Sequence, residues 1–121
     1  MTILVPIRTV SCTNAREHWR VRAKRVKEER IAVAWLLRPA FWHRRLTARL
    51  PCTVTLTRIA PRDVDDDNLR GALKGCRDEV AAHIGVDDRD ERITWRYGQR
   101  RGRVREYAVE IHITVSEMSH D

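Results

Sequence analysis

The spacing of hydrophobic positions along this chain changes several times, and each change marks an expected element. Residues 2–7 are a short β-branched run that predicts an edge strand, because Pro6 cannot donate to a β-ladder. Residues 51–60 alternate apolar side chains with threonines, which predicts a half-buried strand. Residues 93–97 alternate into a third strand. Residues 104–115 predict the longest strand, with one face made of Tyr107, Val109, Ile111, Ile113 and Val115.

A first helix is expected to begin at Asn14, which has capping-box spacing to Glu17, and to end near Leu37, before Pro39. Its first half is strongly basic, whereas residues 31–37 are almost wholly apolar. Such a helix would bury its C-terminal half and present its N-terminal half to an anionic partner. The alternative is a solvated face, partly balanced by the acidic residues Glu17, Glu28 and Glu29.

Helical spacing returns over residues 69–84, and Gly85 then supplies a C-terminal stop. The apolar positions of this helix are Leu69, Ala72, Leu73, Cys76, Val80 and Ile84. The order β-α-β-α-β-β predicts a single α+β domain over residues 1–121, with a mixed or antiparallel sheet packed against two main helices.

The chain is strongly basic, with 24 Lys and Arg against 17 Asp and Glu and a formal net charge of +7. Nearly all the basic residues are arginine, whose planar fork suits phosphate oxygens. Because these residues are clustered, a nucleic-acid-binding surface is favoured over a generic basic one. The segment 41–50 has two interpretations: it contacts nucleic acid through residues such as Trp42 and Arg44, or its aromatic side chains cover the core. The basic segment 99–103 is predicted to be a hairpin tip.

The composition disfavours several other classes of protein. The longest apolar run, residues 31–37, is too short to span a bilayer, and no signal peptide is evident, so we expect a cytoplasmic protein without a membrane role. Cys12, Cys52 and Cys76 are widely spaced and form no Cys-x-x-Cys pair. This argues against a zinc site and indicates that Cys52 and Cys76 are small core side chains.

The segment Asp63-Val64-Asp65-Asp66-Asp67-Asn68 places four carboxylates together in an otherwise basic chain. Carboxylates this close repel one another and are best tolerated around a cation. The segment lies where a predicted strand gives way to a predicted helix, so rigid elements on both sides would fix it. An oxygen-rich site for a hard metal on a cationic protein suggests phosphodiester chemistry.

This acidic segment has two other possible interpretations. An EF-hand calcium loop is excluded because Asn68 occupies the position that needs glycine and Lys74 the position that needs a bidentate glutamate. Helix capping by Asp66, Asp67 or Asn68 explains one or two of the residues but not all four carboxylates. Capping and metal binding are compatible.

A second acidic segment contains Asp87, Asp88 and Asp90 and precedes the strand that begins at Ile93. If that strand runs beside residues 53–59, one of these acids is expected to approach Asp65 and Asp67. Three carboxylates around one or two Mg²⁺ ions would activate a water and stabilise the leaving oxygen. Lys74 shares a helical stripe with Asp67, Arg70 and Asp78. It would stabilise transition-state charge or simply pair with Asp78.

With both acidic segments in view, the chain resembles the RusA family of Holliday-junction resolvases over about residues 61–97. That family has Asp-x-Asp-Asn opening a helix, a lysine on the helix, and then glycine and an acidic pair before a strand. The matching residues here are Asp65-Asp66-Asp67-Asn68, Lys74, and Gly85 with residues 87–90.

Two departures from the family pattern affect the site residues. The family lysine usually lies three residues after the asparagine, where this chain has Gly71, and Lys74 is preferred to Arg70 as its replacement. Counting from Gly85 places the acidic pair on Arg89 and Asp90, so Asp90 is the first choice for the third acid and Asp88 the second.

The resemblance implies a homodimer that binds branched DNA, the four-way junction, and makes paired Mg²⁺-dependent incisions without an organic cofactor. Such enzymes occur in bacteria and their prophages. The implied metal ligands are Asp65, Asp67 and either Asp90 or Asp88, with Lys74 assisting electrostatically. Phosphate contacts are expected from Arg16, Arg20, Lys24, Lys27, Arg70, Arg100, Arg101 and Arg103.

A non-catalytic module that binds branched or duplex DNA, with a structural acidic loop, is the alternative function. A small regulatory or capsid-related interaction protein is a third. The acidic segments disfavour both, because carboxylates on a pure DNA-binding face would repel phosphate.

Overall fold

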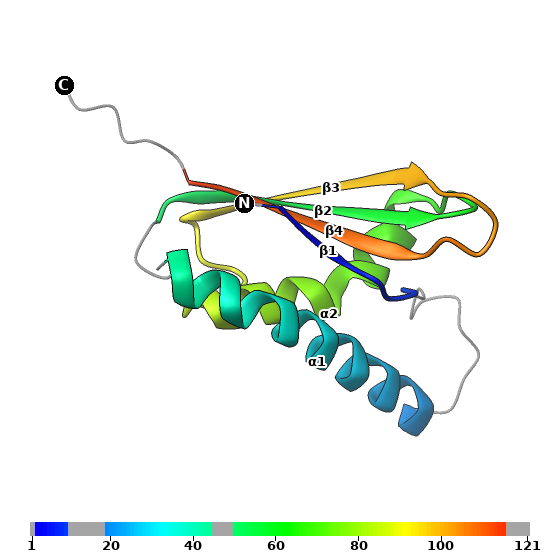
Figure 1. The fold of residues 1–121 in the computed structure, drawn as a ribbon, viewed down its shortest axis with the longest axis horizontal. Helices are drawn as coiled ribbons and strands as arrows, with labels where there is room; N and C mark the ends of the chain where they lie inside the picture. Colours follow the sequence, from blue (N-terminus) through cyan, green and yellow to red (C-terminus); the bar gives the residue numbers. More distant parts are fainter. Residues whose placement is uncertain (1, 10–18, 45–49, 116–121) are drawn as a thin grey trace.

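The computed structural model describes residues 2–9, 19–44 and 50–115. Its elements are β1 (Thr2–Val5), α1 (Trp19–Arg44), β2 (Cys52–Ala60), α2 (Asp66–Ile84), β3 (Ile93–Arg101) and β4 (Ala108–Val115). The strands form one mixed sheet in the order β1-β4-β2-β3, and both helices lie on the same side of it (Figure 1). The predicted α+β class and the predicted order of elements are confirmed, and β1 is an edge strand as expected.

The parallel pairing of β2 with β3 sets the layout of the sheet. The two strands run in the same direction, with Cys52 opposite Ile93 and Ala60 opposite Arg101. After β2 the chain must therefore return along the sheet before β3 begins, and α2 makes this return. β4 pairs antiparallel with the other side of β2. Because β2 separates β3 from β4, the predicted hairpin tip at residues 99–103 is wrong. β3 continues to Arg101, and the chain then crosses the end of β2, where Gly102 N donates to Ala60 O (2.9 Å).

The core lies between the sheet and the helices, and it contains most of the apolar positions predicted from the spacing. Its members from β2, α2 and β4 include Cys52, Val54, Leu56, Leu69, Leu73, Cys76, Val80, Ile84, Val109, Ile111 and Ile113. The predicted strand 104–115 is shorter than expected, since β4 begins at Ala108, and Tyr107 lies outside the core. Cys52 and Cys76 are buried free thiols, as predicted, and Cys12 lies outside the described residues. Burial raises the pKa of the Cys76 thiol to about 12, so this side chain acts as a core hydrophobe.

Helix α1 departs from its prediction in two respects. It continues through Pro39 to Arg44 instead of ending near Leu37, because a proline removes one helical hydrogen bond without obliging the helix to stop. Its apolar segment is only partly buried, since a helix covered on one side buries one stripe. Val33 and Leu37 are fully buried, whereas Trp35 is 71% exposed. The proposed capping residue Asn14 lies outside the described residues.

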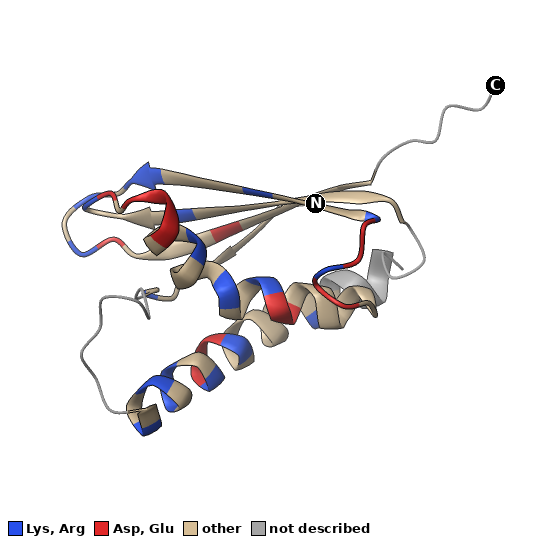
Figure 2. Ribbon diagram, turned by 180° about the vertical axis from the view of Figure 1, so that it is seen from behind, with Lys and Arg blue, Asp and Glu red and all other residues tan. Residues whose placement is uncertain are grey.

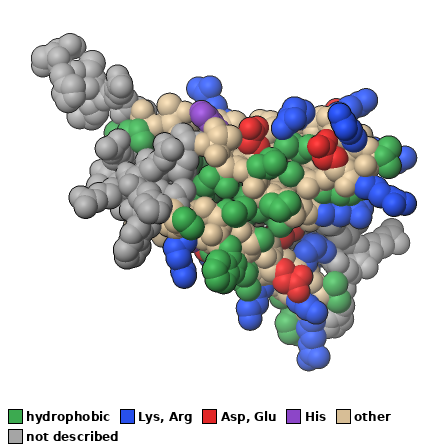
Figure 3. Space-filling model, in the orientation of Figure 1, with side chains coloured by type: hydrophobic (Ala, Val, Ile, Leu, Met, Phe, Trp, Pro, Cys, Tyr) green, Lys and Arg blue, Asp and Glu red, His purple; other side chains and the backbone are tan. Residues whose placement is uncertain are grey.

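Figure 3 shows hydrophobic side chains gathered on the face that carries β1 and α1, with basic side chains around them. Leu4, Ile31 and Trp35 are among the exposed apolar residues of these two elements. None of the helices in the described part of the chain is both long and apolar enough to cross a membrane.

Glu29 is a buried carboxyl group at the contact between α1 and α2. It faces Gly75, where a Cβ atom would lie 3.3 Å from Glu29 Oε2, so the close approach of the helices depends on this glycine. Glu29 is 7% exposed, and its Oε1 has no hydrogen-bond partner among the described residues. Burial raises the pKa of Glu29 from 4.5 to about 7, although the positive charge of Arg25 opposes the shift.

We expect the free energy of unfolding to fall as the pH rises toward and past 7. The pKa of Glu29 is higher in the folded than in the unfolded chain. The stability linked to its protonation is therefore fully present below 4.5 and lost as the pH rises through about 7. The loss amounts to roughly 3 kcal/mol. Glu29→Gln should abolish this pH dependence, measured by chemical denaturation at about pH 5 and about pH 8.

The matched control is Glu28→Gln, which changes the exposed neighbouring carboxylate and should keep the wild-type pH dependence. A Glu29→Gln protein that loses stability with pH as the wild type does would contradict the assignment.

Candidate functional site

The loop between β2 and α2 is held in place by β3 and by its own helix cap. Val64 N donates to Gln99 Oε1 (3.0 Å), and Gln99 Nε2 donates to Val64 O (2.8 Å), so one side chain binds both backbone polar groups of Val64. Asp65 is the N-cap of α2, and its Oδ1 accepts from Asn68 N (2.9 Å). The predicted strand-to-helix junction is therefore present and is fixed from both sides.

The four carboxylates of this loop do not have equal surroundings. Asp63 is tied to β3, since Arg101 Nε lies 3.3 Å from Asp63 Oδ2. Asp65, Asp66 and Asp67 are exposed at the N-terminus of α2, where the helix dipole favours negative charge. The helix end thus presents three carboxylates to solvent.

A groove runs beside these carboxylates, between α2 and the edge strand β3. Two cavities share Arg70 and Tyr97 and so form this α2–β3 groove. One, of about 360 Å³, is lined by Arg70, Gly71, Lys74, Arg77, Asp88 and Tyr97. The other, of about 410 Å³, is lined by Asp66, Leu69, Arg70, Trp95, Arg96 and Tyr97. A larger cavity of about 570 Å³ lies between α1 and Glu79, but it contains none of the predicted acids.

Three cations of α2 line the groove. Arg70, Lys74 and Arg77 are spaced four and three residues apart, so they lie on one helical face. The guanidinium carbon of Arg70 lies 5.6 Å from the centre of the Tyr97 ring, and that of Arg77 lies 4.9 Å from the Trp95 ring. The Lys74 side chain is 69% exposed, and its Nζ is 3.6 Å from Asp78 Oδ2, an i,i+4 pair that a phosphate can readily replace.

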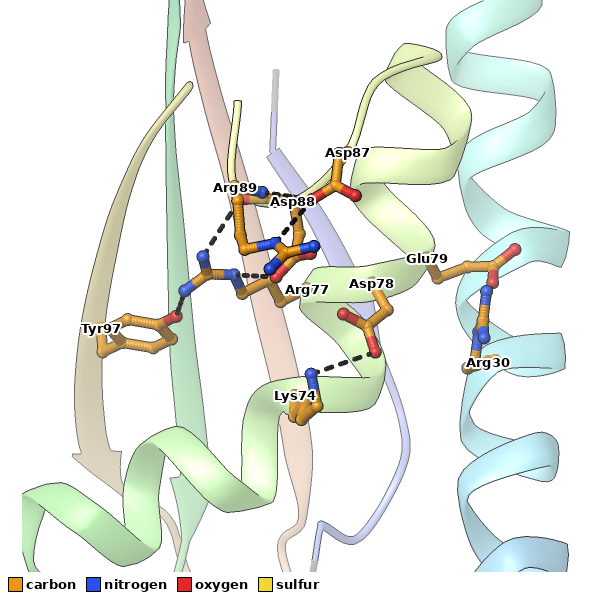
Figure 4. A network of polar contacts seen from close by, with 9 residues as sticks. All are labelled: Arg30, Lys74, Arg77, Asp78, Glu79, Asp87, Asp88, Arg89 and Tyr97. Carbon is orange, nitrogen blue, oxygen red and sulfur yellow. Dashed lines mark hydrogen bonds and ion pairs between the residues drawn. The ribbon is translucent and has the colours of Figure 1, made fainter. Parts of the chain in front are cut away.

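Arg77 connects the second acidic segment to the groove (Figure 4). Its Nε lies 3.0 Å from Asp88 Oδ2, and its terminal nitrogens donate to Asp88 O (3.0 Å) and to Tyr97 Oη. Trp95 Nε1 also donates to Asp88 O (2.8 Å). Asp88 is thereby fixed at the end of the groove that is farther from the N-terminus of α2.

Asp90, the first choice for the third acid, has a different environment. Arg92 donates to both of its carboxylate oxygens (3.0 and 2.8 Å), and these hydrogen bonds lower the pKa of Asp90 to about 2. Asp90 does not line the α2–β3 groove, whereas Asp88 does. The geometry therefore favours Asp88 as the acid of the second segment that shares a surface with Lys74.

The expected approach of the second acidic segment to Asp65 and Asp67 is not observed. In a parallel pair the start of β3 lies beside the start of β2, whereas residues 65–67 follow the end of β2. Arg77, which holds Asp88, is ten residues after Asp67, about 15 Å along the helix axis. Within residues 2–9, 19–44 and 50–115, no three His, Cys, Asp or Glu side chains are close enough together to hold a metal ion.

Asp65 and Asp67 nevertheless suit a hard cation. Mg²⁺ is commonly held by one or two carboxylates and takes its remaining ligands from water and substrate phosphates. Asp65 is the N-cap and Asp67 lies in the first turn of α2. Both are exposed, and the cap bond uses only one oxygen of Asp65. The pair can therefore anchor a metal that is completed by a phosphate in the neighbouring groove.

The other predicted phosphate contacts lie on three surfaces, and Figure 2 shows basic residues on α1, on α2 and around the link between β3 and β4. Arg20, Lys24 and Lys27 are exposed on α1. Arg100 and Arg103 are exposed near the end of β3, with Arg101 paired to Asp63. Arg16 lies outside the described residues.

Sequence reasoning missed four residues that shape this site: Gln99, Arg77, Trp95 and Tyr97. Arg77 could have been found, because it lies seven residues after Arg70 and therefore on the same helical face. The contact between Gln99 and Val64 had no local signal, since it joins positions 35 residues apart.

Comparison with known proteins gives little further information. No protein-family model matches the chain. An uncharacterized protein of Xylella fastidiosa (strain Temecula1) is 37% identical over 82 residues, which make up 63% of this chain and 52% of that protein. The chain thus spans about half the length of this relative, whose description carries no function.

We expect Arg77→Met to loosen the second acidic segment. The change removes the charged partner of Asp88 and should lower stability by about 1–2 kcal/mol. It should also speed amide exchange at Asp90 and Ile93, whose N–H groups donate within this segment. Hydrogen–deuterium exchange measures the effect, and Arg89→Met, which affects only the exposed Asp87 pair, is the control. Equal protection of the segment in both variants would contradict this role of Arg77.

Proposed function

We propose that the protein is a Mg²⁺-dependent, structure-selective DNA endonuclease of the RusA type, which resolves four-way junctions by paired incisions. The observation that carries the proposal is the placement of Asp65 and Asp67 at a rigid helix N-terminus, where the intervening Asp66 lines one end of a groove that also contains cations. Carboxylates at one end bind a hard metal, and the cations along the groove bind phosphates. The motif resemblance over residues 61–97 supports the same reaction.

The residues divide the chemistry between them. A bound Mg²⁺ ion would polarise the scissile phosphate and lower the pKa of an attacking water. Asp65 and Asp67 would hold the ion. The cap bond fixes Asp65, and the hydrogen bonds from Gln99 fix the preceding residue, Val64. Lys74 is exposed on the groove and stabilises the negative charge that develops at phosphorus.

Asp88 acts through Arg77 in this proposal. Their ion pair keeps the guanidinium in the groove, where it meets a second phosphate. Paired incisions at symmetric positions of a junction need two active sites, so the proposal includes a homodimer.

A non-catalytic module that binds branched DNA is the second candidate, and one observation favours it. Two carboxylates of the second acidic segment form ion pairs with arginines, Asp88 with Arg77 and Asp90 with Arg92. A structural role accounts for such pairs without any metal. This candidate predicts junction binding that is unaffected by metal and by Asp67→Asn.

The test is cleavage of a labelled mobile four-way junction, with a linear duplex of matched sequence, in Mg²⁺ or in EDTA. The wild type should nick the junction in pairs, leave the duplex intact and be inactive in EDTA. Asp67→Asn should lower the cleavage rate more than about 100-fold. This is a greater loss than is typical when a residue that only orients a metal ligand is removed.

Asp63→Asn is the matched control for this assay. It makes the same chemical change two residues before Asp65, at a carboxylate that pairs with Arg101, and it should keep most of the activity. Tight junction binding without cleavage under any divalent metal would establish the binding module instead.

A further inference from the structure

We infer that the α2–β3 groove binds a single unpaired nucleic-acid strand, which it takes from the branch point of the substrate, in preference to the paired arms. For the reaction that follows, the inference rests on the proposed function. The binding step itself can be measured separately. Three features of the groove support this inference: its volume, the spacing of its cations and its stacking surfaces.

The groove has the volume of a small-molecule site. It lies between a helix and the neighbouring edge strand of one sheet, and its two cavities measure about 360 and 410 Å³. Such volumes suit one or two nucleotide units.

The cations match a single backbone that lies lengthwise along α2. Arg70, Lys74 and Arg77 follow one another at about 6 and 4.5 Å along the helix axis, from a rise of 1.5 Å per residue. A strand that lies lengthwise along the helix would therefore meet one cation at about each successive turn. The groove ends at Asp66 and Asp88, whose negative charges favour phosphates between them, over the three cations, rather than beyond.

The stacking surfaces distinguish an unpaired strand from a paired one. Tyr97 and Trp95 are half-buried on β3, and each has a guanidinium group over its ring. Aromatic rings and flat guanidinium groups are the surfaces on which exposed bases stack. A base inside a duplex has both faces covered by its neighbours, so only an unpaired base can use them.

A strand held in this way leads to the carboxylates. The cavity that contains Trp95 and Tyr97 also contains Asp66, which lies between Asp65 and Asp67. The phosphate delivered to these residues is therefore the one beside the unpaired nucleotides. The site would select branched DNA by capturing nucleotides that unpair at the branch point, with little demand on sequence.

The test is fluorescence anisotropy with a short labelled oligo(dT) and a mixed-sequence duplex of the same length, in EDTA and at fixed salt. Lys74→Gln and Tyr97→Leu should each weaken oligo(dT) binding about tenfold, the effect of one lost phosphate or stacking contact, and change duplex binding by less than about threefold. Tyr97→Phe keeps the ring and should retain most of the affinity. Arg38→Gln, an exposed change on α1 away from the groove, should alter neither ligand selectively.

Equal weakening of both ligands by Lys74→Gln and Tyr97→Leu would overturn the inference, because the groove would then be part of a general basic surface. Unchanged oligo(dT) binding in both variants would overturn it as well. A wild type that binds oligo(dT) through the groove but cuts no junction would refute the nuclease proposal and leave this inference standing.

Discussion

The parallel pairing of β2 with β3 is the constraint on which the rest of the structure depends. Parallel neighbours need a crossover, and α2 supplies it by running the length of the sheet. The first acidic segment therefore lies at one end of this helix, and the second follows its other end. β3 is an edge strand, and the α2–β3 groove lies open beside it. The parallel pairing therefore both exposes this groove and places the two acidic segments at opposite ends of α2.

The electrostatics of this surface follow from that layout. Carboxylates cluster at the N-terminus of α2, where the dipole favours them, and cations occupy the face that looks toward β3. Side chains of β3 reach both regions, since Gln99 holds the acidic loop and Tyr97 contacts Arg70 and Arg77. The edge strand thus positions the metal-binding and the phosphate-binding parts of the proposed site relative to each other.

The structural features that depend on local periodicity could be predicted from the sequence. The buried faces of β2, α2 and β4 follow from spacings of two and of three to four residues, and the stop at Gly85 follows from its left-handed conformation (φ 91°). A place for β3 beside residues 53–59 was considered from the sequence and is observed. Its parallel direction could not be predicted, because strand direction depends on contacts between distant residues. The arginine partners of Asp88 and Asp90 were likewise not predicted, since Arg77 reaches Asp88 only through the fold.

The measurement that tests the central claim most directly is paramagnetic broadening of amide NMR signals by Mn²⁺, a substitute for Mg²⁺ that reports its own position. The account predicts that the amides of residues 65–69 broaden first as Mn²⁺ is added, and that Asp67→Asn removes this broadening. Broadening centred on residues 87–92, or none that Asp67→Asn changes, would contradict the claim that the N-terminus of α2 holds the metal.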